Sequence, residues 1–593
     1  MPRLTGGEIV ARTLNNYGIE YAAGIPGHGI WVLLDGFLQD GNDVDLLQVF
    51  HEQSAVHMAD GYYRATGRPM AAITSVGAGA ANTVLGLATA YSDSVPVLTI
   101  TGAPPLGMQG HGCLQELDRK DDNGLARSFE PVTKRRWSIK TLEELPFVLH
   151  RAFSAMLTGR PGPVHLEIPM DLQAQAADVN LHDLEKRLPQ GRFFPDPESI
   201  EDAAAVLRDA KRPVIVVGGG VINAGASAEL LRVAEALQAP VVVTWSGKGA
   251  FPEDHPLFVG PIGQTGTIPG NAVPAAADAV LAVGCRFSDW SASSYSKGIT
   301  FSMPPAKLVQ IDIEPHEIGK NYPVEVGVLA DAKPALADLA EAVGTATGRE
   351  DYLAEIASLK ADWAQKESTR LDSEQTPFTS QRPLRDLRRV MDRDGIIVSG
   401  SGNTQGAVKQ SFPVYEPRTH LTSAGFSAMG WATPAAIGAK LGQPDRQVVC
   451  ILGDGDFLMT SQEIGVAAQH EIPVVFVVQN NSGFMSIRGG QRKLMDRFTM
   501  SEFTRKGEPY TVDMTAIGKA FGIDTVRVED SDSMESTFAA ALASEGPSLI
   551  EVPTSRDAAG PWVPGWWDFP VPEYHQGEAQ EEYQEKMAAE QHQ

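Results

Sequence analysis

A proline followed by a short run of β-branched apolar residues recurs along the chain and constrains its fold more than any other feature. The runs are Pro96–Ile100, Pro213–Val217, Pro240–Val243 and Pro473–Val478. Continuous apolar runs of this length are typical of parallel strands buried on both faces of a sheet. Helical patterns lie between them, as in Ala226–Leu237 and Ser461–Gln469. This alternation predicts an α/β fold of doubly wound parallel sheets.

The chain is too long for one hydrophobic core, because it has 593 residues and cores stop growing near ~250–300 residues. Two polar, proline-containing stretches, Glu185–Ser199 and Glu367–Pro383, are interpreted as linkers. They predict three domains of similar size, at residues 1–182, 195–345 and 380–560. Residues 561–593 would then form a tail that begins with an aromatic cluster, made up of Trp562, Trp566, Trp567 and Phe569.

Charge and cysteine content limit the partners and the compartment. The formal net charge is −25, so the basic surface that nucleic acid or anionic lipid requires is not expected, and neither is a nucleic-acid or membrane partner. Three widely spaced cysteines argue against disulfides and zinc and favour a cytoplasmic location. The N-terminus has no apolar stretch typical of a signal peptide. The uncharged segment Met70–Tyr91 contains two central glycines and predicts a strand, a turn and a buried helix.

Polar residues follow two of the expected C-terminal strands. The first strand, Val448–Leu452, leads into Gly453-Asp454-Gly455-Asp456, and the second, Val474–Val478, leads into Gln479-Asn480-Asn481-Ser482-Gly483. Carboxylate and amide oxygens are hard ligands suited to Mg²⁺. A helix expected from about Ser461 would direct backbone amides to a phosphate. The sequence therefore predicts a metal-bridged diphosphate site at the edge of a parallel sheet.

With Asn481 placed 27 residues after Asp454, this pattern resembles the cofactor-binding motif of thiamine diphosphate (ThDP)-dependent enzymes. The resemblance implies that the side chains of Asp454 and Asn481, with the carbonyl of Gly483, hold Mg²⁺. It also implies that four neighbouring residues contact the cofactor, namely Gly453, Gly455, Asp456 and Met485.

A second resemblance lies in the first domain. The stretch His51–Gly61 resembles the segment that carries the catalytic glutamate of these enzymes, which assigns that role to Glu52. A carboxyl group bonded to N1′ of the aminopyrimidine promotes the imino tautomer. The imino nitrogen then takes the proton from C2 of the thiazolium ring.

Two further segments resemble the loops that shape this cofactor site. The stretch Ser423–Gly430 resembles the segment that bends the cofactor, which implies that the Ser427 carbonyl accepts a hydrogen bond from the 4′-amino group. Met429 would lie between the two rings. The second segment, Gly402-Asn403-Thr404, resembles the loop that closes over the diphosphate. Acetolactate synthases commonly have Gln-His in place of its Asn-Thr.

The resemblance covers nearly the whole chain in the order pyrimidine, middle and diphosphate domain, as in acetolactate synthase and pyruvate oxidase. In that family the cofactor lies between two subunits, so a homodimer or homotetramer is implied. The middle domain is similar to one that holds FAD, which implies contacts from Gly218, Gly219, Gly284, Arg286, Asp312 and Asp331. Many relatives keep this domain without the nucleotide, and Ser288 and Trp290 replace the usual Asp and Arg. A middle domain that binds FAD and one that has lost the nucleotide therefore both remain possible from the sequence.

Three positions bear on the substrate. His28 stands where acetolactate synthases have glycine, in a loop that faces C2 of the thiazolium, and could donate to an alkoxide or move a proton. Gln115 matches a family position that contacts the substrate. The stretch Met485–Gly490 contains no tryptophan. Acetolactate synthases have a tryptophan in this region that selects their acceptor keto acid.

These differences, with Thr74–Gly77 and the tail Trp566–Glu573, resemble a side branch that hydrolyses cyclic 1,2-diketones. The expected protein is thus a ThDP- and Mg²⁺-dependent enzyme that makes or breaks a C–C bond beside a carbonyl, on a 2-oxo acid or 1,2-diketone. Cleavage of a cyclic 1,2-diketone is the first hypothesis. Acetolactate synthase or 2-oxo acid decarboxylase is the alternative, and a flavin-dependent oxidase like pyruvate oxidase is the third. A non-catalytic relative is disfavoured, because Glu52, Asp454 and Asn481 are all present.

Overall fold

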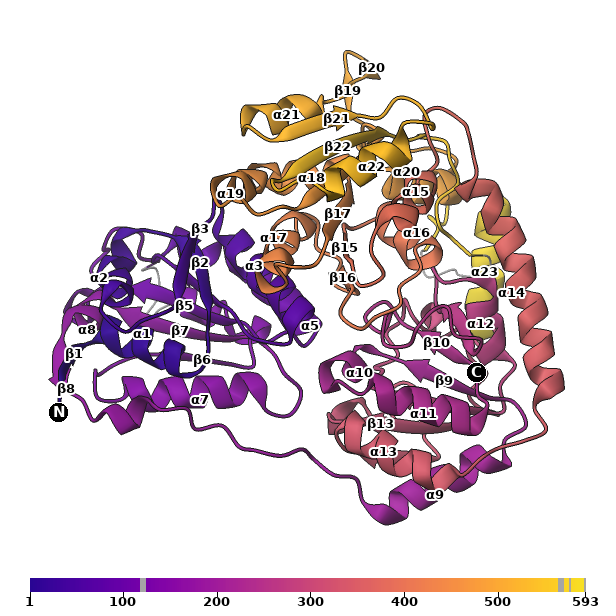
Figure 1. The fold of residues 1–593 in the computed structure, drawn as a ribbon, viewed down its shortest axis with the longest axis horizontal. Coiled ribbons are helices and arrows are strands. Elements are labelled where there is room, and N and C mark those ends of the chain that lie inside the picture. Colours follow the sequence, from indigo (N-terminus) through magenta and orange to yellow (C-terminus); the bar gives the residue numbers. More distant parts are fainter. Residues whose placement is uncertain (118–123, 564–569, 575–576, 591–593) are drawn as a thin grey trace.

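Three six-stranded sheets organise the molecule, and every strand pair in them is parallel. The structure is a computed structural model that describes residues 1–117, 124–563, 570–574 and 577–590. Figure 1 shows the N-terminal sheet at one end of the molecule and the middle and C-terminal sheets at the other. The predicted α/β fold with three doubly wound sheets is therefore confirmed. The residue limits set for the domains from the sequence remain a prediction.

The N-terminal sheet has the order β3-β2-β4-β5-β7-β6. Its strands are β2 (Tyr21–Ile25), β3 (Asp45–Gln48), β4 (Ala71–Thr74), β5 (Leu98–Ala103), β6 (Arg135–Ser138) and β7 (Val164–Pro169). Helices α1 (Gly6–Asn16) and α7 (Leu145–Leu157) cover one face of this sheet through apolar contacts. Helices α3 (Glu52–Thr66) and α5 (Val84–Ser92) cover the other face in the same way. Helices on both faces explain why these strands are apolar without alternation.

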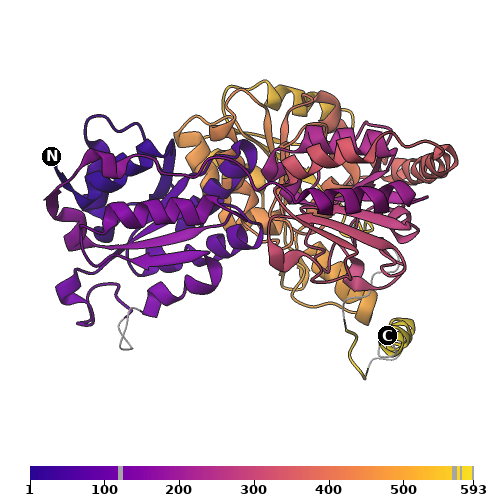
Figure 2. The ribbon, with the colours of Figure 1, turned by 90° about the horizontal axis from the view of Figure 1, so that it is seen from below.

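The middle sheet has the order β11-β10-β9-β12-β13-β14. Its strands are β9 (Pro213–Val217), β10 (Val241–Val243), β11 (Phe258–Pro261), β12 (Ala279–Val283), β13 (Lys307–Asp312) and β14 (Val326–Leu329). The helices on its two faces are α9 (Pro197–Asp209), α11 (Ser227–Leu237) and α13 (Ala332–Val343) on one, with α12 (Ile268–Ala275) and α14 (Glu350–Leu371) on the other. Seen from below, this part lies beside the C-terminal part and away from α1 and α7 (Figure 2).

The C-terminal sheet has the order β16-β15-β17-β18-β22-β21. Its strands are β15 (Ile396–Ser399), β16 (His420–Thr422), β17 (Val448–Gly453), β18 (Val475–Asn480), β21 (Asp524–Arg527) and β22 (Ser548–Pro553). The strands β17 and β18 are direct neighbours, with Gly453 opposite Gln479. Because parallel strands end at the same edge of a sheet, the polar segments that follow these two strands meet.

Helix α3 of the N-terminal domain packs closely against α17 (Ala432–Gly442) of the C-terminal domain. A Cβ atom on Gly61 would lie 2.1 Å from the carbonyl oxygen of Ala435, and one on Gly438 would lie 2.0 Å from that of Met58. Only glycine permits this approach, and one apolar core continues through both domains. The docked helix begins at Glu52, the residue expected from the sequence to be catalytic.

Several local expectations need correction. The helix expected from about Ser461 is present as the 3-10 turn Ser461–Glu463 and α19 (Ile464–Gln469), but a further helix, α18 (Asp454–Thr460), precedes it and begins at Asp454. An aspartate in the first turn of a helix is stabilised by the helix dipole, so the glycine-rich segment is helical and not a turn. The first part of the second predicted linker belongs to α14, which ends at Leu371. Of the tail's aromatic cluster, Trp566, Trp567 and Phe569 lie outside the described residues.

The segment Met70–Tyr91 forms β4, the short helix α4 (Ala78–Ala81) and most of α5, as its sequence predicted. Among the described residues, no helix is both long and apolar enough to cross a membrane.

Acid sensitivity is expected from His165, which is fully buried in β7 and stacks on Phe129 with ring centroids 3.8 Å apart. Burial lowers the pKa of His165 to about 3. As the pH falls below ~6.5, the unfolded chain takes up a proton that the native state does not, so the free energy of unfolding falls by up to ~1.4 kcal/mol per pH unit. The H165Q variant should show a smaller fall of the urea unfolding midpoint between about pH 7 and pH 5. An equal fall in both proteins would contradict the assignment.

Candidate functional site

The carboxylate of Asp454 lies at the junction of β17 and α18, where it is almost completely buried. Its Oδ2 atom accepts a hydrogen bond from the backbone N–H of Gly483 at 3.0 Å, and its Oδ1 atom accepts one from Gly455 at 3.0 Å. Burial raises the pKa of Asp454 to about 6. The structure thus brings Asp454 and Gly483 together, as the spacing of the two polar segments predicted.

Asn481, which follows β18, carries a buried polar atom without a partner. Its Nδ2 group faces the hydroxyl of Thr554 at 3.4 Å, but among the described residues its Oδ1 atom makes no hydrogen bond. Arg556 fixes the segment by donating to the carbonyls of Asn481 and Ser482, both at 2.9 Å. An unpaired buried oxygen is costly, and it suits a hard cation held together with Asp454.

The donor set fits Mg²⁺ better than zinc. Within the described ranges, no group of three or more His, Cys, Asp or Glu side chains could hold a metal ion. The pair Asp454 and Asn481 offers one carboxylate oxygen and one amide oxygen, and the backbone of Gly483 adjoins them. Such a set leaves coordination positions for the phosphate oxygens and water that Mg²⁺ usually keeps.

Asp456 ties two loops of the site together. Its Oδ2 atom accepts the N–H of Ser401 at 2.6 Å, and its Oδ1 atom accepts the N–H of Gly430 at 2.6 Å. Burial raises the pKa of Asp456 to about 6. Both oxygens are therefore engaged with the backbone, and the contact that Asp456 was expected to make with a cofactor stays a prediction.

The other predicted cofactor residues line the same edge of the sheet. Gly402 has φ +86° and precedes α16 (Asn403–Ser411), whose Thr404 hydroxyl donates to Gln479 at 3.0 Å. The Ser427 carbonyl accepts a hydrogen bond from the Ser401 hydroxyl at 2.8 Å and has a second lone pair left for a ligand. Met429 is half-buried beside Gly430, and Met485 is buried at the start of α20 (Met485–Met495).

The N-terminal candidates gather around the turn after β4. The Oε2 atom of Glu52 accepts a hydrogen bond from the side chain of Asn82 at 2.9 Å, and a Cβ atom on Gly79 would lie 3.1 Å from Oε1. Gly77 has φ +64°, and a Cβ atom there would meet the carbonyl oxygen of Gln115 at 2.0 Å. Glu52 and Gln115, far apart in the sequence, therefore border one turn.

His28 belongs to the same cluster. The hydroxyl of Ser75, two residues before Gly77, accepts the N–H of Gly29 at 3.2 Å. The His28 ring is half-buried and meets the edge of Trp31, with centroids 6.4 Å apart. The loop that carries His28 thus packs on the turn that separates Glu52 from Gln115.

The structure does not join the two halves of the site within one chain. Glu52 bonds to the N-terminal domain, whereas Asp454 bonds to backbone groups of the C-terminal domain. Among the described residues, no hydrogen bond connects Glu52, His28 or Gln115 to the metal-binding candidates.

A separate cavity of about 810 Å³ lies among the three domains. All six residues predicted to contact FAD line it, namely Gly218, Gly219, Gly284, Arg286, Asp312 and Asp331. Its walls also include residues 189–193 of the first linker and the loop residues Ala424 and Gly425. The cavity therefore reaches from the middle domain to the segment that carries Ser427.

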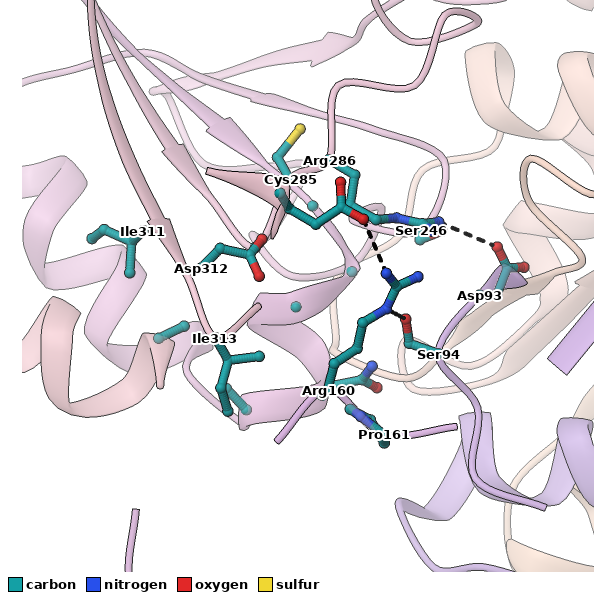
Figure 3. Close-up of a pocket in the computed structure, with 18 of the residues that line it drawn as sticks. Asp93, Ser94, Arg160, Pro161, Ser246, Cys285, Arg286, Ile311, Asp312 and Ile313 are labelled. Carbon is teal, nitrogen blue, oxygen red and sulfur yellow. Dashed lines mark hydrogen bonds and ion pairs between the residues drawn. The ribbon is translucent and has the colours of Figure 1, made fainter. Parts of the chain in front are cut away.

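Charged residues from the N-terminal domain complete this cavity, and sequence reasoning missed them. Arg160 donates to Ser94 at 2.8 Å and pairs with Glu317 at 2.9 Å, while Arg286 lies 3.8 Å from Asp93. Figure 3 shows the two arginines side by side, between Asp312 and Asp93. No local motif marks Arg160, because its place depends on the docking of two domains.

The carboxylate of Asp312 lies at the end of β13 and lines the cavity. Burial raises its pKa, although the N–H of Glu314 donates to it at 2.9 Å. An acidic group at this position of a doubly wound sheet can accept hydrogen bonds from the ribose hydroxyls of a nucleotide.

Comparison with known proteins places this fold and site in a family. The chain matches the family models of the thiamine pyrophosphate enzymes in all three parts. The N-terminal TPP binding domain matches residues 4–122, the central domain residues 200–339, and the C-terminal TPP binding domain residues 400–552. Thiamine pyrophosphate is the cofactor called ThDP above. The chain belongs to the thiamine pyrophosphate enzyme family and is a ThDP-dependent enzyme.

Within that family the chain is acetolactate synthase-like. It is 35% identical to a probable acetolactate synthase large subunit of Methanocaldococcus jannaschii, over 95% of this chain and 94% of that protein. It is 31% identical to the acetolactate synthase isozyme 3 large subunit of Escherichia coli, over 91% and 93%. The large subunit of Corynebacterium glutamicum is 34% identical, over 90% and 84%. These relatives favour the alternative hypothesis of the sequence analysis over diketone cleavage.

Proposed function

We propose that this enzyme uses ThDP and Mg²⁺ to join a two-carbon unit from a 2-oxo acid to a second carbonyl compound, as the names of its relatives indicate for them. The observation that carries the proposal is the unpaired Oδ1 atom of Asn481, two residues before Gly483, whose N–H bonds the carboxylate of Asp454. A metal-bridged diphosphate satisfies both groups at once.

In this proposal the chain's residues divide into holding and proton-moving groups. Asp454, Asn481 and the carbonyl of Gly483 hold Mg²⁺, with the backbone near Gly453, Gly455 and the Gly402–Thr404 loop around the diphosphate. Bound ThDP supplies a nucleophilic carbon that adds to a carbonyl group. Glu52 hydrogen-bonds the aminopyrimidine ring and maintains the tautomer that removes a proton. Gln115 contacts the substrate from the turn beside Glu52.

The separation of the two half-sites supports a homodimer. Glu52 of one subunit would face the Asp454 half-site of the other, and two such dimers would form a tetramer. Cytoplasmic location remains part of this proposal.

FAD is proposed as the occupant of the cavity that the three domains share. Its volume of about 810 Å³, the two acidic residues at strand ends and the glycines around β9 and β12 support a dinucleotide. A yellow purified protein with flavin absorbance is the expected result. A flavin that is reduced during turnover would favour the oxidase alternative.

Hydrolytic cleavage of a cyclic 1,2-diketone is the second candidate, and the position of His28 favours it. His28 lies against the turn that carries the Glu52 contacts, where a general base could activate water. Water would add to one carbonyl, the bond between the two carbonyl carbons would break, and the released carbon would take a proton. An imidazole can both accept and donate a proton, so His28 could serve both transfers.

The H28G variant tests which candidate holds. Purified enzyme loaded with ThDP and Mg²⁺ is given pyruvate, 2-oxobutyrate and cyclohexane-1,2-dione, and products are identified by mass. If the enzyme cleaves diketones, H28G should suppress that reaction while ThDP affinity stays nearly unchanged. If wild-type enzyme leaves the diketone intact and forms acetolactate at ordinary rates of ~1–10³ s⁻¹, the first candidate stands and the second is wrong.

A further inference from the structure

A buried carboxylate of the C-terminal domain, Glu463, lies against the start of α3. Glu463 ends the short 3-10 helix Ser461–Glu463 and is fully buried. Its Oε2 atom accepts a hydrogen bond from the backbone N–H of Phe50 at 3.3 Å, across 413 residues of sequence. Phe50 stands two residues before Glu52, so this contact joins the C-terminal domain to the segment that leads into the catalytic residue.

Other groups at the start of α3 also face this carboxylate. The backbone of His51, the N-cap of α3, and the hydroxyl of Ser54 both favour its ionised form. Among the described residues that buried hydroxyl has no hydrogen-bond partner within ordinary distance, so it is free to turn toward this carboxylate. A negative group at the positive end of a 15-residue helix is electrostatically favourable. Burial opposes ionisation and raises the pKa of Glu463 to about 7.

The segment before Glu52 is anchored to the same domain by apolar contacts. The rings of Phe50 and Phe521 lie with their centroids 6.4 Å apart. A Cβ atom on Gly465 would lie 3.0 Å from the ring of Phe50. One residue after Glu52, the side chain of Gln53 lies near Gly430. Residues on both sides of Glu52 therefore lie against the C-terminal domain of the same chain, while the Glu52 side chain bonds Asn82.

We propose that Glu463 is a positioning residue that fixes the start of α3 and thereby the carboxyl group of Glu52. The proposal rests on the function proposed above for Glu52. A buried acid is expensive to keep in a protein interior unless its hydrogen bonds are needed. Besides a bond from the adjacent Gln462 side chain, Glu463 accepts one from Phe50, at the approach to Glu52. Small displacements of a catalytic group can cost up to ~10²-fold in rate.

The test combines two variants at Glu463 with E52Q. In E463A, proton exchange at C2 of bound ThDP should slow by up to ~10²-fold. E463Q should lose less, because its amide oxygen still accepts from Phe50. The double variant E52Q/E463A should be no slower than E52Q, since residues that act as one unit are not additive. The control E367A removes another buried carboxylate, bonded to Ser411 on α16 and remote from α3, and should leave exchange unchanged.

A second readout needs no cofactor. In the cofactor-free protein, amide hydrogen exchange of a peptide covering residues 47–54 should be faster in E463A than in wild type, less so in E463Q, and unchanged in E367A. Equal protection in all four proteins would overturn the proposal, as would additive losses in E52Q/E463A. Should E463A fail to fold, E52Q/E463Q provides the same comparison. A wild-type protein that binds ThDP without exchanging its C2 proton would instead contradict the proposed function.

Discussion

The E52Q variant should exchange the C2 proton of bound ThDP ~10²–10⁴-fold more slowly than wild type, the usual cost of losing a general acid–base group. Glutamine has the size of glutamate but cannot share a proton with N1′ of the aminopyrimidine. It can still accept the hydrogen bond that Asn82 donates to Glu52, so the turn should keep its shape. ThDP affinity should therefore change little.

The measurement is NMR-monitored C2–H/D exchange after rapid acid quench, with ThDP affinity obtained by calorimetry. E143Q, at an exposed position of the same domain, is the matched control and should behave as wild type. Unchanged exchange in E52Q would show that another group activates the cofactor.

The D454A variant should lose ThDP retention almost completely. The carboxylate is the one charged ligand of the predicted metal site, and its loss leaves the buried Asn481 oxygen without a cation. The diphosphate would then face a chain of net charge −25 without a bridge. The amount of ThDP that remains with the protein after gel filtration measures this directly.

D445A replaces an exposed aspartate of the same domain and should retain ThDP as wild type does. Removing divalent ions with a chelator should release ThDP from wild type, and adding Mg²⁺ should restore binding. ThDP that stays bound and active without any divalent ion would contradict the assignment of Asp454.

The sheets could be predicted because their strands are buried on both faces. The run Pro213–Val217 became β9 residue for residue, and Pro473–Val478 covers most of β18. The helix α18 was not predicted, since Gly453-Asp454-Gly455 has the composition of a turn. A helix is stabilised there by tertiary contacts, because the Asp454 carboxylate accepts hydrogen bonds from the backbone amides of Gly455 and Gly483.

Residues that act across domain boundaries could not be predicted. Arg160 lines the cavity where it pairs with Glu317 of the middle domain. Glu463 reaches Phe50 where α3 docks on the C-terminal domain through Gly61 and Gly438. Each of these side chains looks like an ordinary surface charge in the sequence, because its charged or backbone partner lies 157 residues away for Arg160 and 413 for Glu463.

The central claim is that this chain makes or breaks a carbon–carbon bond beside a carbonyl with bound ThDP and Mg²⁺. ¹³C NMR of reactions with labelled pyruvate and labelled cyclohexane-1,2-dione tests it most directly. The account predicts a product with a new or a broken C–C bond from at least one substrate, formed only when both ThDP and Mg²⁺ are present. Carbon skeletons that stay unchanged in both reactions, although the protein is saturated with ThDP and Mg²⁺, would contradict it.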